Sequence, residues 1–577
     1  MNPSAKLLIL REKSVTVKTP GVAFSDQSVI TAPLFVKIAI AQLNPLVGDV
    51  PGNCEKALSF IEAAKRSKAE WILFPELFLE GYPPRDLLDF SRLRRENREA
   101  LERIQKASKG LGVIIGALRE NPKKTGKLFF NSAFVFVNGE SAFSYDKKLL
   151  PSYDVFEDER YFEKGTGRGV FEWAGQKIGV LICEDVWNRE GFVERPYEAD
   201  PVRELKQEKL SALFVLSASP FDLKKQALRE KLLSQIANEL KTAVVYCNQV
   251  SGNDELLFDG GSTIVDGNGE TRLTLPLFEE AFEVWESGQG VCRKPWPKSE
   301  SECLFKALSF GIRDYVRKSH HQKICLGLSG GIDSSVAAVL AVDAVGKENV
   351  LGVSLPSRFT SAASREDARK LAEALGIRFE EISIESVFES FEKTLSLIKP
   401  SGLTLENIQP RIRMTLLMAL SNQEGSLILN TSNKSEIAAG YSTLYGDSAG
   451  ALAPLGDLLK SQVRSLAAYI NQDQEVVPRR VIDRAPTAEL RPDQKDEDTL
   501  PPYSVLDPLV NACLTEHLGL EELETKGFSK ESLELFGRLH RVSEYKRKQM
   551  PPVLRVSTKA FGAGRRIPLA ARNYSDK

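Results

Sequence analysis

Two successive series of short apolar runs and helical stretches constrain the fold of this chain most strongly. The first series begins at KIAIAQL (37–43), where a buried strand is expected, and a helix with an apolar stripe follows it. The stretch 286–300 is rich in Gly, Pro and charge, and a second series begins after it. Alternation of this kind predicts α/β folds. We therefore expect an N-terminal extension (1–36), an α/β domain (37–285), a linker (286–300) and a second α/β domain (301–577).

The expected strands are apolar runs bounded by loops or helical segments. After the first strand, they lie at 71–74, 113–118, 132–137, 177–182, 213–217, 243–248, 323–328, 350–355 and 427–430. Helices are expected near 57–64, over 301–318, from Ser335 and from Ser364. Ser364 and Asp367 have the spacing of a capping box, which predicts the start of the last of these helices.

Composition excludes several classes of protein. No run approaches the 18 apolar residues of a membrane span, and the apolar patch near the N-terminus is too short for a signal peptide. Lys and Arg number 77 against 78 for Asp and Glu, so the net charge of -1 argues against a nucleic-acid partner. We expect a cytoplasmic protein that acts on small molecules.

The cysteines and histidines favour neither disulfides nor zinc. The seven cysteines are an odd number and contain no CxxC pair, and the four histidines are not at metal spacing. A chain of this length can bury a core without such crosslinks. We expect a reduced protein. A cysteine with a specific role would act as a reactive group, not in a disulfide or a zinc site.

The sharpest motif of the second series is the loop in LGLSGGIDSSVAAVLA (326–341). A strand ends before it, and a helix begins after it. Glycines let the backbone approach a polyphosphate, while the helix N-terminus offers free N–H groups. The residues expected to bind ATP here are Ser329, Gly330, Gly331, Asp333, Ser334 and Ser335. Asp333 can also hold Mg²⁺, and the loop lacks the Gly-Lys-Ser/Thr of a Walker A motif.

SGGIDSS resembles the pyrophosphate-binding loop of the ATP pyrophosphatases. The blocks that follow, at 406–422, 427–463, 486–507 and 544–552, are similar to NAD synthetases. The resemblance implies a doubly wound parallel sheet of the adenine nucleotide alpha hydrolase type. It also implies MgATP and deamido-NAD (nicotinic acid adenine dinucleotide) as substrates.

The same resemblance assigns further residues of the second domain. ATP contacts are expected from Thr431, Lys460 and Thr487, and a second Mg²⁺ oxygen from Glu436, which we place in a loop after the strand at 427–430. Deamido-NAD contacts are expected from Asn407, Arg411, Glu436, Lys546 and Arg547. Two positions depart from the family pattern: Ser432 stands where glycine is usual, and Pro410 where a small residue is usual.

The C-terminal stretch 541–572 is strongly basic. It holds nine Lys and Arg residues and one acidic residue, Glu544. A stripe of this kind commonly forms a solvated or nucleic-acid-facing surface. Because aromatic residues for stacking several bases are few, we expect a dinucleotide pyrophosphate to be its partner, with Lys546 and Arg547 as the contacts.

In the first domain, Cys183 follows the apolar run 177–182 and therefore lies at the end of an expected strand. A thiol is mostly protonated at neutral pH, so a nucleophilic cysteine needs a base or a cation nearby. Glu76 and Lys147 follow other expected strands. Together they suffice for amide hydrolysis: Glu76 would take the thiol proton, and Lys147 would stabilise the oxyanion.

FPEL (74–77), YDKKLLP (145–151) and CEDVW (183–187) resemble, in this order, the nitrilase superfamily, which implies an αββα sandwich. Further blocks are similar to its glutaminase branch. By that resemblance, glutamine would be bound by Tyr153, Phe156, Ser219 and Arg229. Glu157 would orient Lys147, and the spacing from Tyr145 favours Lys147 over Lys148 as the catalytic lysine.

Together, the two resemblances imply a ligase that releases ammonia from glutamine and uses it to amidate adenylated deamido-NAD. A shielded path for ammonia and at least a homodimer through the second domain are expected. Another glutamine-dependent ATP-pyrophosphatase amidotransferase is the first alternative, although its usual glutaminase motifs are not visible. An inactive nucleotide sensor is disfavoured because both motifs are intact, and a tRNA-modifying enzyme because no basic RNA-binding domain is visible.

Overall fold

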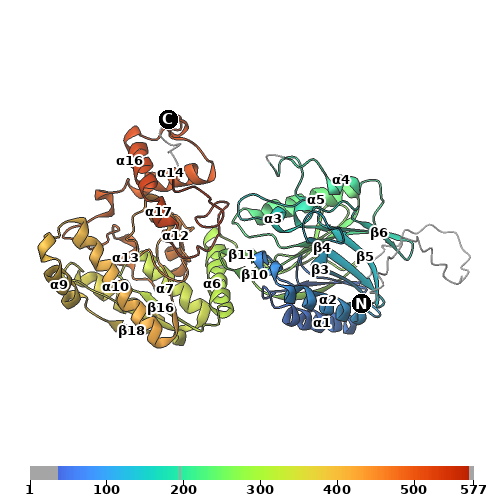
Figure 1. The fold of residues 1–577 in the computed structure, drawn as a ribbon, viewed down its shortest axis with the longest axis horizontal. Coiled ribbons are helices and arrows are strands. Elements are labelled where there is room, and N and C mark those ends of the chain that lie inside the picture. The colour runs from blue at the N-terminus through green and yellow to red at the C-terminus, as the bar shows by residue number, and fades with distance from the viewer. Residues whose placement is uncertain (1–36, 194–195, 571–577) are drawn as a thin grey trace, which may run out of the picture. The chain divides into compact units, whose positions relative to one another are not determined.

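The structure is a computed structural model that describes residues 37–193 and 196–570 (Figure 1). The described residues lie in one compact unit. The expected N-terminal extension (1–36) lies outside the described residues.

Two β-sheets form the centre of the N-terminal part. The first has the strand order β14-β1-β2-β3-β4-β5, and the second has the order β15-β13-β12-β9-β8-β7-β6. The first consists of β1 (Lys37–Gln42), β2 (Trp71–Leu73), β3 (Gly112–Glu120), β4 (Phe129–Val137), β5 (Glu140–Asp146) and β14 (Ala281–Glu286). The second consists of β6 (Val170–Trp173), β7 (Gln176–Ile182), β8 (Ala212–Ser217), β9 (Ala243–Asn248), β12 (Thr263–Val265), β13 (Thr271–Thr274) and β15 (Cys292–Arg293).

Helices cover the outer faces of these sheets. Alternate residues of a strand point to opposite faces, and β1 shows how the layers follow. Ile38 and Ile40 join the core between the two sheets, whereas Ala39 packs in the core with α1 (Val50–Arg66) and α2 (Ser91–Ala107). The core between the sheets continues through β8 to α5 (Lys225–Leu240). The observed αββα sandwich confirms the predicted architecture.

Shorter elements complete the N-terminal part. They are η1 (Arg85–Asp89), α3 (Asp158–Tyr161), η2 (Cys183–Val186), α4 (Pro201–Glu204), and the hairpin of β10 (Val250–Asn253) and β11 (Leu256–Asp259). β15 lies inside the stretch 286–300 that the sequence marks as a linker, and it pairs in parallel with β13. The domain boundaries themselves stay a prediction.

The C-terminal part is built on a parallel sheet with the order β18-β17-β16-β19. Its strands are β16 (Lys323–Gly327), β17 (Val350–Ser354), β18 (Arg378–Glu381) and β19 (Ser426–Ile428). The strand order reverses between β16 and β19, which makes this a doubly wound sheet with a ligand crevice expected at their carboxyl ends.

Helices lie on both faces of this sheet, as Figure 1 shows for α7 and α10. Ile324 and Leu326 of β16 pack with residues of α6, α7, α8 and α12, whereas Cys325 packs with residues of α9 and α10. These helices are α6 (Glu300–Lys318), α7 (Ile332–Val345), α8 (Ala362–Leu375), α9 (Glu385–Thr394), α10 (Leu403–Glu424) and α12 (Lys460–Ile470). Short η3 (Lys347–Asn349) and η4 (Ser396–Ile398) follow α7 and α9.

A helical layer follows near the C-terminus. Its core joins Ile437, Leu506, Leu523 and Phe536. The elements of this region are α11 (Lys434–Ala439), α13 (Arg479–Asp483), η5 (Asp496–Asp498), α14 (Tyr503–Thr515), α15 (Leu520–Thr525), α16 (Lys530–Val542) and α17 (Glu544–Arg547). None of the helices in the described part of the chain is long and apolar enough to cross a membrane.

Every apolar run expected as a strand overlaps an observed strand. Two local predictions are wrong. The helix expected to begin at Ser364 begins at Ala362, because Ser361 is its N-cap and accepts a hydrogen bond from the N–H of Ser364. Glu436, expected in a loop, lies in the first turn of α11.

Candidate functional site

Cys183 is the first residue of η2 and directly follows β7. Its backbone φ is 43°, in the left-handed region that non-glycine residues adopt rarely and that is concentrated at functional sites. The side chain is buried, and Sγ accepts a hydrogen bond of 3.3 Å from the hydroxyl of Ser217. Burial, together with the negative charge of Glu76, raises the pKa of the Cys183 thiol. The thiol is therefore protonated near neutral pH and needs a base.

Glu76 and Lys147 form a buried ion pair. Lys147 Nζ lies 2.7 Å from Glu76 Oε1, and Asn131 Nδ2 donates a hydrogen bond of 2.7 Å to the same oxygen. Burial alone would lower the pKa of Lys147, but the carboxylates of Asp158 and Glu76 raise it well above its ordinary value. Lys147 thus stays an ammonium ion, so it is a cation and not a base at this site.

The second carboxylate beside Lys147 belongs to Asp158. Its Oδ2 lies 2.7 Å from Lys147 Nζ, and its Oδ1 accepts a hydrogen bond of 2.9 Å from the hydroxyl of Tyr82. Glu157 instead pairs with Arg566 at 2.8 Å. The expectation that Glu157 orients Lys147 is therefore wrong by one residue.

The neighbouring Lys148 is engaged elsewhere. Its Nζ lies 2.5 Å from Glu204 Oε2, and its backbone N–H donates to Asp185 Oδ1 at 3.1 Å. Of the two adjacent lysines, only Lys147 contacts Glu76, so the geometry favours it as the cation of this site.

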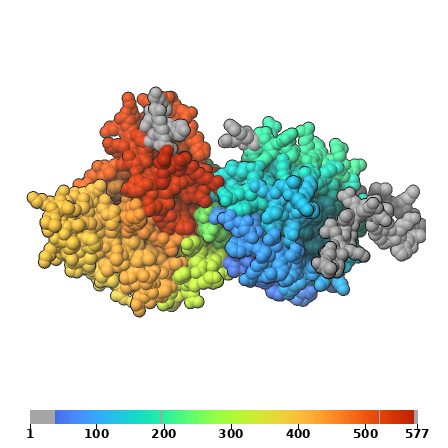
Figure 2. Space-filling model, in the orientation of Figure 1, coloured from blue at the N-terminus to red at the C-terminus, as the bar shows by residue number. Residues whose placement is uncertain are grey.

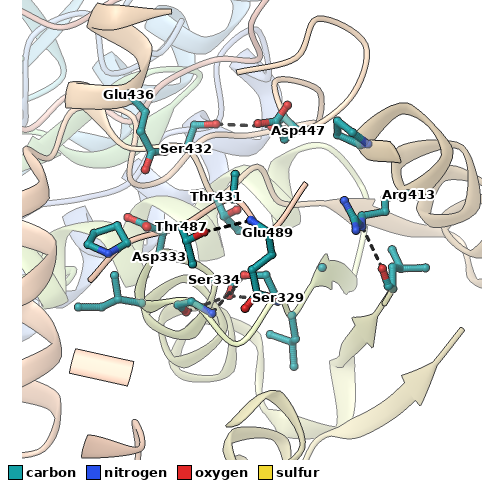
Figure 3. Close-up of a pocket in the computed structure, with 18 of the residues that line it drawn as sticks. Ser329, Asp333, Ser334, Arg413, Thr431, Ser432, Glu436, Asp447, Thr487 and Glu489 are labelled. Carbon is teal, nitrogen blue, oxygen red and sulfur yellow. Dashed lines mark hydrogen bonds between the residues drawn. The ribbon is translucent and has the colours of Figure 1, made fainter. Parts of the chain in front are cut away.

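A second site lies at the carboxyl ends of β16 and β19, where a cavity of about 310 Å³ opens (Figure 3). Eight residues predicted to bind ATP or Mg²⁺ line it: Ser329, Gly331, Asp333, Ser334, Thr431, Glu436, Lys460 and Thr487. Both departures from the family pattern, Pro410 and Ser432, line it as well. The cavity therefore stands where the reversal of strand order predicts a ligand crevice.

Gly330 and Ser335 are the other two loop residues predicted to bind ATP. They do not line the cavity, but they stabilise the conformation of the loop. Gly330 has a φ of 76°, and a Cβ atom there would lie 2.2 Å from the carbonyl oxygen of Ser364. Only glycine fits this approach without strain. The hydroxyl of Ser335 donates a hydrogen bond of 2.8 Å to the carbonyl of Gly331 and so holds the turn.

Lys460 joins the two predicted magnesium ligands. Its Nζ lies 2.5 Å from Asp333 Oδ2 and 3.1 Å from Glu436 Oε1. Asn433, the N-cap of α11, donates a hydrogen bond of 3.0 Å to Asp333 Oδ1. Burial raises the pKa of Glu436 to about 7, although the charge of Lys460 opposes this. The cluster therefore combines one cation with two carboxylates inside the cavity.

The donor set fits a magnesium ion that arrives with phosphates. Within residues 37–193 and 196–570, no group of three or more His, Cys, Asp or Glu side chains is placed to hold a metal. Asp333 and Glu436 supply two carboxylates, and Mg²⁺ commonly combines one or two carboxylates with phosphate and water oxygens. Asp496, which accepts a hydrogen bond of 3.0 Å from Tyr503, lines the same cavity and was missed by the sequence reasoning.

Comparisons with known proteins match both parts of the chain. A family model described as carbon-nitrogen hydrolase matches residues 37–282, and one described as NAD synthase matches residues 304–550. A glutamine-dependent NAD(+) synthetase from Synechocystis sp. is 40% identical over an alignment of 547 residues, and the match covers 92% of this chain and 98% of the relative. The relative of that name from Thermotoga maritima is 39% identical and covers 93% and 99% of the two chains.

The chain belongs to the glutamine-dependent NAD(+) synthetase family. Among solved structures, the family member from Acinetobacter baumannii, in complex with ADP, has a TM-score of 0.74 and 37% identity, and covers 92% of this chain and 98% of its own. The member from Cytophaga hutchinsonii has a TM-score of 0.80 at 21% identity, with 93% and 98% covered, and supports the fold.

The residues that the family resemblance assigned to glutamine binding differ in the contacts that they already make within the protein. The rings of Tyr153 and Phe156 meet edge to face at 5.2 Å. Ser219 Oγ is fully buried and has no hydrogen-bond partner among the described residues. Arg229, in contrast, is tied to Asp259 by contacts of 3.0 and 3.2 Å. Its binding of glutamine stays a prediction, for which the geometry offers no support.

Three charged or polar residues near Cys183, namely Glu184, Tyr197 and Lys225, were not predicted as site residues. Glu184, directly after Cys183, is buried and accepts hydrogen bonds from the hydroxyls of Tyr153 (3.1 Å) and Tyr197 (3.0 Å). Lys225 Nζ lies 5.4 Å from the ring of Trp187, and burial lowers its pKa. Glu184 belongs to the CEDVW motif (183–187), but the motif alone does not show which of its carboxylates contacts the tyrosine hydroxyls.

Four residues expected to bind deamido-NAD gather around the stretch 437–444 and do not line the cavity. Asn407 accepts a hydrogen bond from Thr443 (2.8 Å), and Arg411 donates to the carbonyl of Leu444 (3.1 Å). Lys546 donates to the carbonyls of Gly440 (2.9 Å) and Ser442 (2.7 Å). The fifth, Glu436, is the one that lines the cavity.

Arg547 is buried and engaged within the protein. It donates to the carbonyls of Ile437 and Ala438 and to Glu544. Other members of the basic stretch are also paired: Arg565 with Glu544, and Arg555 with Asp154. That Arg547 contacts a dinucleotide stays a prediction, for which the geometry of the described residues offers no support, and Arg572 lies outside them.

Proposed function

We propose that this chain is a glutamine-dependent NAD(+) synthetase, a ligase that converts deamido-NAD, ATP and glutamine to NAD+, AMP, pyrophosphate and glutamate. The observation that carries the proposal is that one chain holds two separate catalytic clusters. One is a buried Cys–Glu–Lys set at the first site, and the other a Lys–Asp–Glu set in a cavity at the reversal point of a parallel sheet. The family membership supports the same conclusion.

At the first site, the Cys183 thiolate would attack the side-chain amide carbon of glutamine while Glu76 takes the thiol proton. Lys147, which stays protonated, would stabilise the oxyanion. Glu76 would return the proton to the nitrogen as the carbon–nitrogen bond breaks, which releases ammonia and leaves a thioester. Water activated by Glu76 would then release glutamate and restore the thiol.

Recognition of glutamine would use the charged groups beside the nucleophile. Glu184, which holds two tyrosine hydroxyls, would accept the α-ammonium group. Lys225, the first residue of α5, directly follows the loop that carries Ser219, and its positive charge suits the α-carboxylate. The unpartnered hydroxyl of Ser219 would bind a polar group of the substrate.

At the second site, the nicotinate carboxylate of deamido-NAD would attack the α-phosphorus of ATP and release pyrophosphate. Ammonia would then attack the acyl adenylate and displace AMP. Asp333 and Glu436 would hold Mg²⁺, which supplies charge neutralisation on the phosphate oxygens when bound. Lys460, already between these carboxylates, would turn its ammonium group to the phosphates. A shielded path for ammonia between the sites is expected because ammonium in water is not nucleophilic.

The active form is proposed to be at least a homodimer in the cytoplasm. α9, α10 and the segment between them expose apolar side chains, among them Phe391 (44%), Leu397 (94%), Ile398 (68%) and Leu403 (69%). Figure 2 shows this region, coloured yellow, on an outer face of the C-terminal part. Apolar surface of this kind marks interfaces, and a second copy of the chain would cover it. Phe391→Glu should lower the sedimentation coefficient to that of a monomer.

One assay tests the proposed function. The protein should form NAD+ from deamido-NAD and MgATP with either glutamine or ammonium as the nitrogen source. Cys183→Ala should lose the glutamine-driven rate and keep the ammonium-driven rate. No NAD+ with ammonium would refute the synthetase assignment, and a Cys183→Ala variant that still uses glutamine would refute the nucleophile.

A further inference from the structure

The segment 553–561 contacts both sites. It follows the last helix of the described chain, and its Val553 forms a bridge with Ala453 beside β19. Leu554 and Val556 join the core of the parallel sheet. Because its apolar residues are buried with that sheet, the segment is anchored in the C-terminal part, and its polar groups remain available for other contacts.

On the nucleotide side, the segment binds the helix that carries Glu436. Lys434, the first residue of α11, donates hydrogen bonds to Ser557 Oγ (2.9 Å) and to the carbonyl of Lys559 (2.7 Å). Lys434 also pairs with Asp457 at 2.8 Å, and Asp457 accepts the N–H groups of residues 556 and 557. Both charged side chains of this contact are buried. The segment therefore has a fixed position relative to α11.

On the other side, the segment reaches one wall of the glutamine site. Arg555 NH2 and Lys559 Nζ each lie 3.0 Å from a different oxygen of Asp154. Asp154 directly follows Tyr153, whose hydroxyl contacts Glu184 beside the nucleophile. A single carboxylate therefore ties the loop with Tyr153 to two cations of the segment.

The segment also contacts a second proposed wall of the glutamine site, the loop of residues 219–224 that carries Ser219. Arg555 donates a hydrogen bond of 3.3 Å to the carbonyl of Phe221, and the carbonyl of Val556 accepts one of 3.1 Å from the N–H of Leu223. Phe221 and Leu223 lie between Ser219 and Lys225 in the chain. The two walls of the glutamine site are thus attached to one short segment, through Asp154 and through the 219–224 loop.

We propose that Asp154, held by Arg555 and Lys559, is a positioning residue. It fixes the loop that carries Tyr153 (the Tyr153 wall) relative to the loop that carries Ser219 (the Ser219 wall), so that both can bind glutamine. This inference rests on the proposed function. The pair of ion contacts is mostly buried, with side-chain exposures of 13% for Asp154, 9% for Arg555 and 21% for Lys559. Loss of the carboxylate would free the Tyr153 wall and weaken glutamine binding, and the reacting groups of both sites would stay in place.

The backbone of Asp154 makes a sharp test possible. Its φ is 52°, in the left-handed region where glycine is unstrained. Asp154→Asn removes the charge and keeps the side-chain volume, whereas Asp154→Gly removes the carboxylate and relieves the backbone. Glu159→Gln, an exposed carboxylate nearby in the chain, is the matched control.

Glutamine-driven and ammonium-driven NAD+ formation would be measured for each variant. Both Asp154 variants should raise KM for glutamine at least fivefold, change kcat less than threefold, and keep the ammonium-driven rate within twofold; Glu159→Gln should change none of these. Lys559→Met should raise KM similarly, and adding it to Asp154→Asn should cause no further loss. The proposal is overturned if KM stays unchanged in both Asp154 variants, or rises only in Asp154→Asn. Failure of the proposed function would appear separately, as absence of NAD+ from the unaltered protein with ammonium.

Discussion

The ion cluster at Lys147 allows one prediction to be worked through in detail. Lys147 Nζ lies 2.7 Å from both Glu76 and Asp158, and its side chain is only 1% exposed. Asp158→Asn keeps the shape of the side chain and removes one of the two negative charges. The amide oxygen can still accept the hydroxyl of Tyr82, which donates to Asp158 at 2.9 Å in the native protein. The variant therefore isolates the charge.

The expected loss follows from the burial of the cluster. Breaking a buried ion pair costs about 3–5 kcal/mol, and the low end of this range applies here because Glu76 still compensates the charge of Lys147. With one carboxylate gone, Lys147 would be held more tightly by Glu76, which would then be a weaker base. If about 3 kcal/mol of this cost appears in the transition state, the glutamine-driven rate falls by about 150-fold.

The assay compares glutamine-driven with ammonium-driven NAD+ formation. Asp158→Asn should lose the first and keep the second within about twofold, which also shows that the protein is folded. The matched variant is Glu157→Gln, whose partner Arg566 is 60% exposed. An exposed ion pair contributes about 0–1 kcal/mol, so this variant should lose less than about fivefold. A larger loss in Glu157→Gln than in Asp158→Asn would refute the assignment of Asp158.

Three further predictions concern other parts of the molecule. Lys460→Met should lower both glutamine- and ammonium-driven NAD+ formation by at least about 100-fold, because two carboxylates that are each only 17% exposed lose their cation, while glutaminase activity measured as glutamate release persists. Chelation of Mg²⁺ should stop NAD+ formation and spare glutamate release, and loss of both would contradict the assignment of the metal to Asp333 and Glu436. Burial raises the pKa of Glu80 to about 8, so the folded chain keeps a proton that the unfolded chain loses near pH 4.5. The free energy of unfolding should therefore fall by about 1 kcal/mol per pH unit between these values, and urea denaturation of Glu80→Gln should show a flatter dependence.

The parts of the sites that the sequence predicted are those attached to ends of strands. Glu76, Cys183 and the Ser329 loop each follow an apolar run, and the ends of such runs are readable because a buried strand has few polar residues. The sequence did not show which carboxylate lies beside Lys147. Glu157 and Asp158 are adjacent acids at the start of the short helix α3, and only the phase of that turn decides which one points inward.

The basic stretch 541–572 shows a second limit, which concerns charge. Its composition suggested an open positive surface, yet Arg555 and Lys559 share Asp154, a residue about 400 positions earlier in the chain. Sequence charge counts only neighbours along the chain, whereas an ion pair depends on which segments the fold brings together. The same basic residues that looked like a dinucleotide surface therefore serve to hold the glutamine loop to the C-terminal part. Because Arg555 and Lys559 contact the loop that carries Tyr153 and no reacting group, the Asp154 variants should change the KM for glutamine and leave ammonium-driven synthesis unchanged.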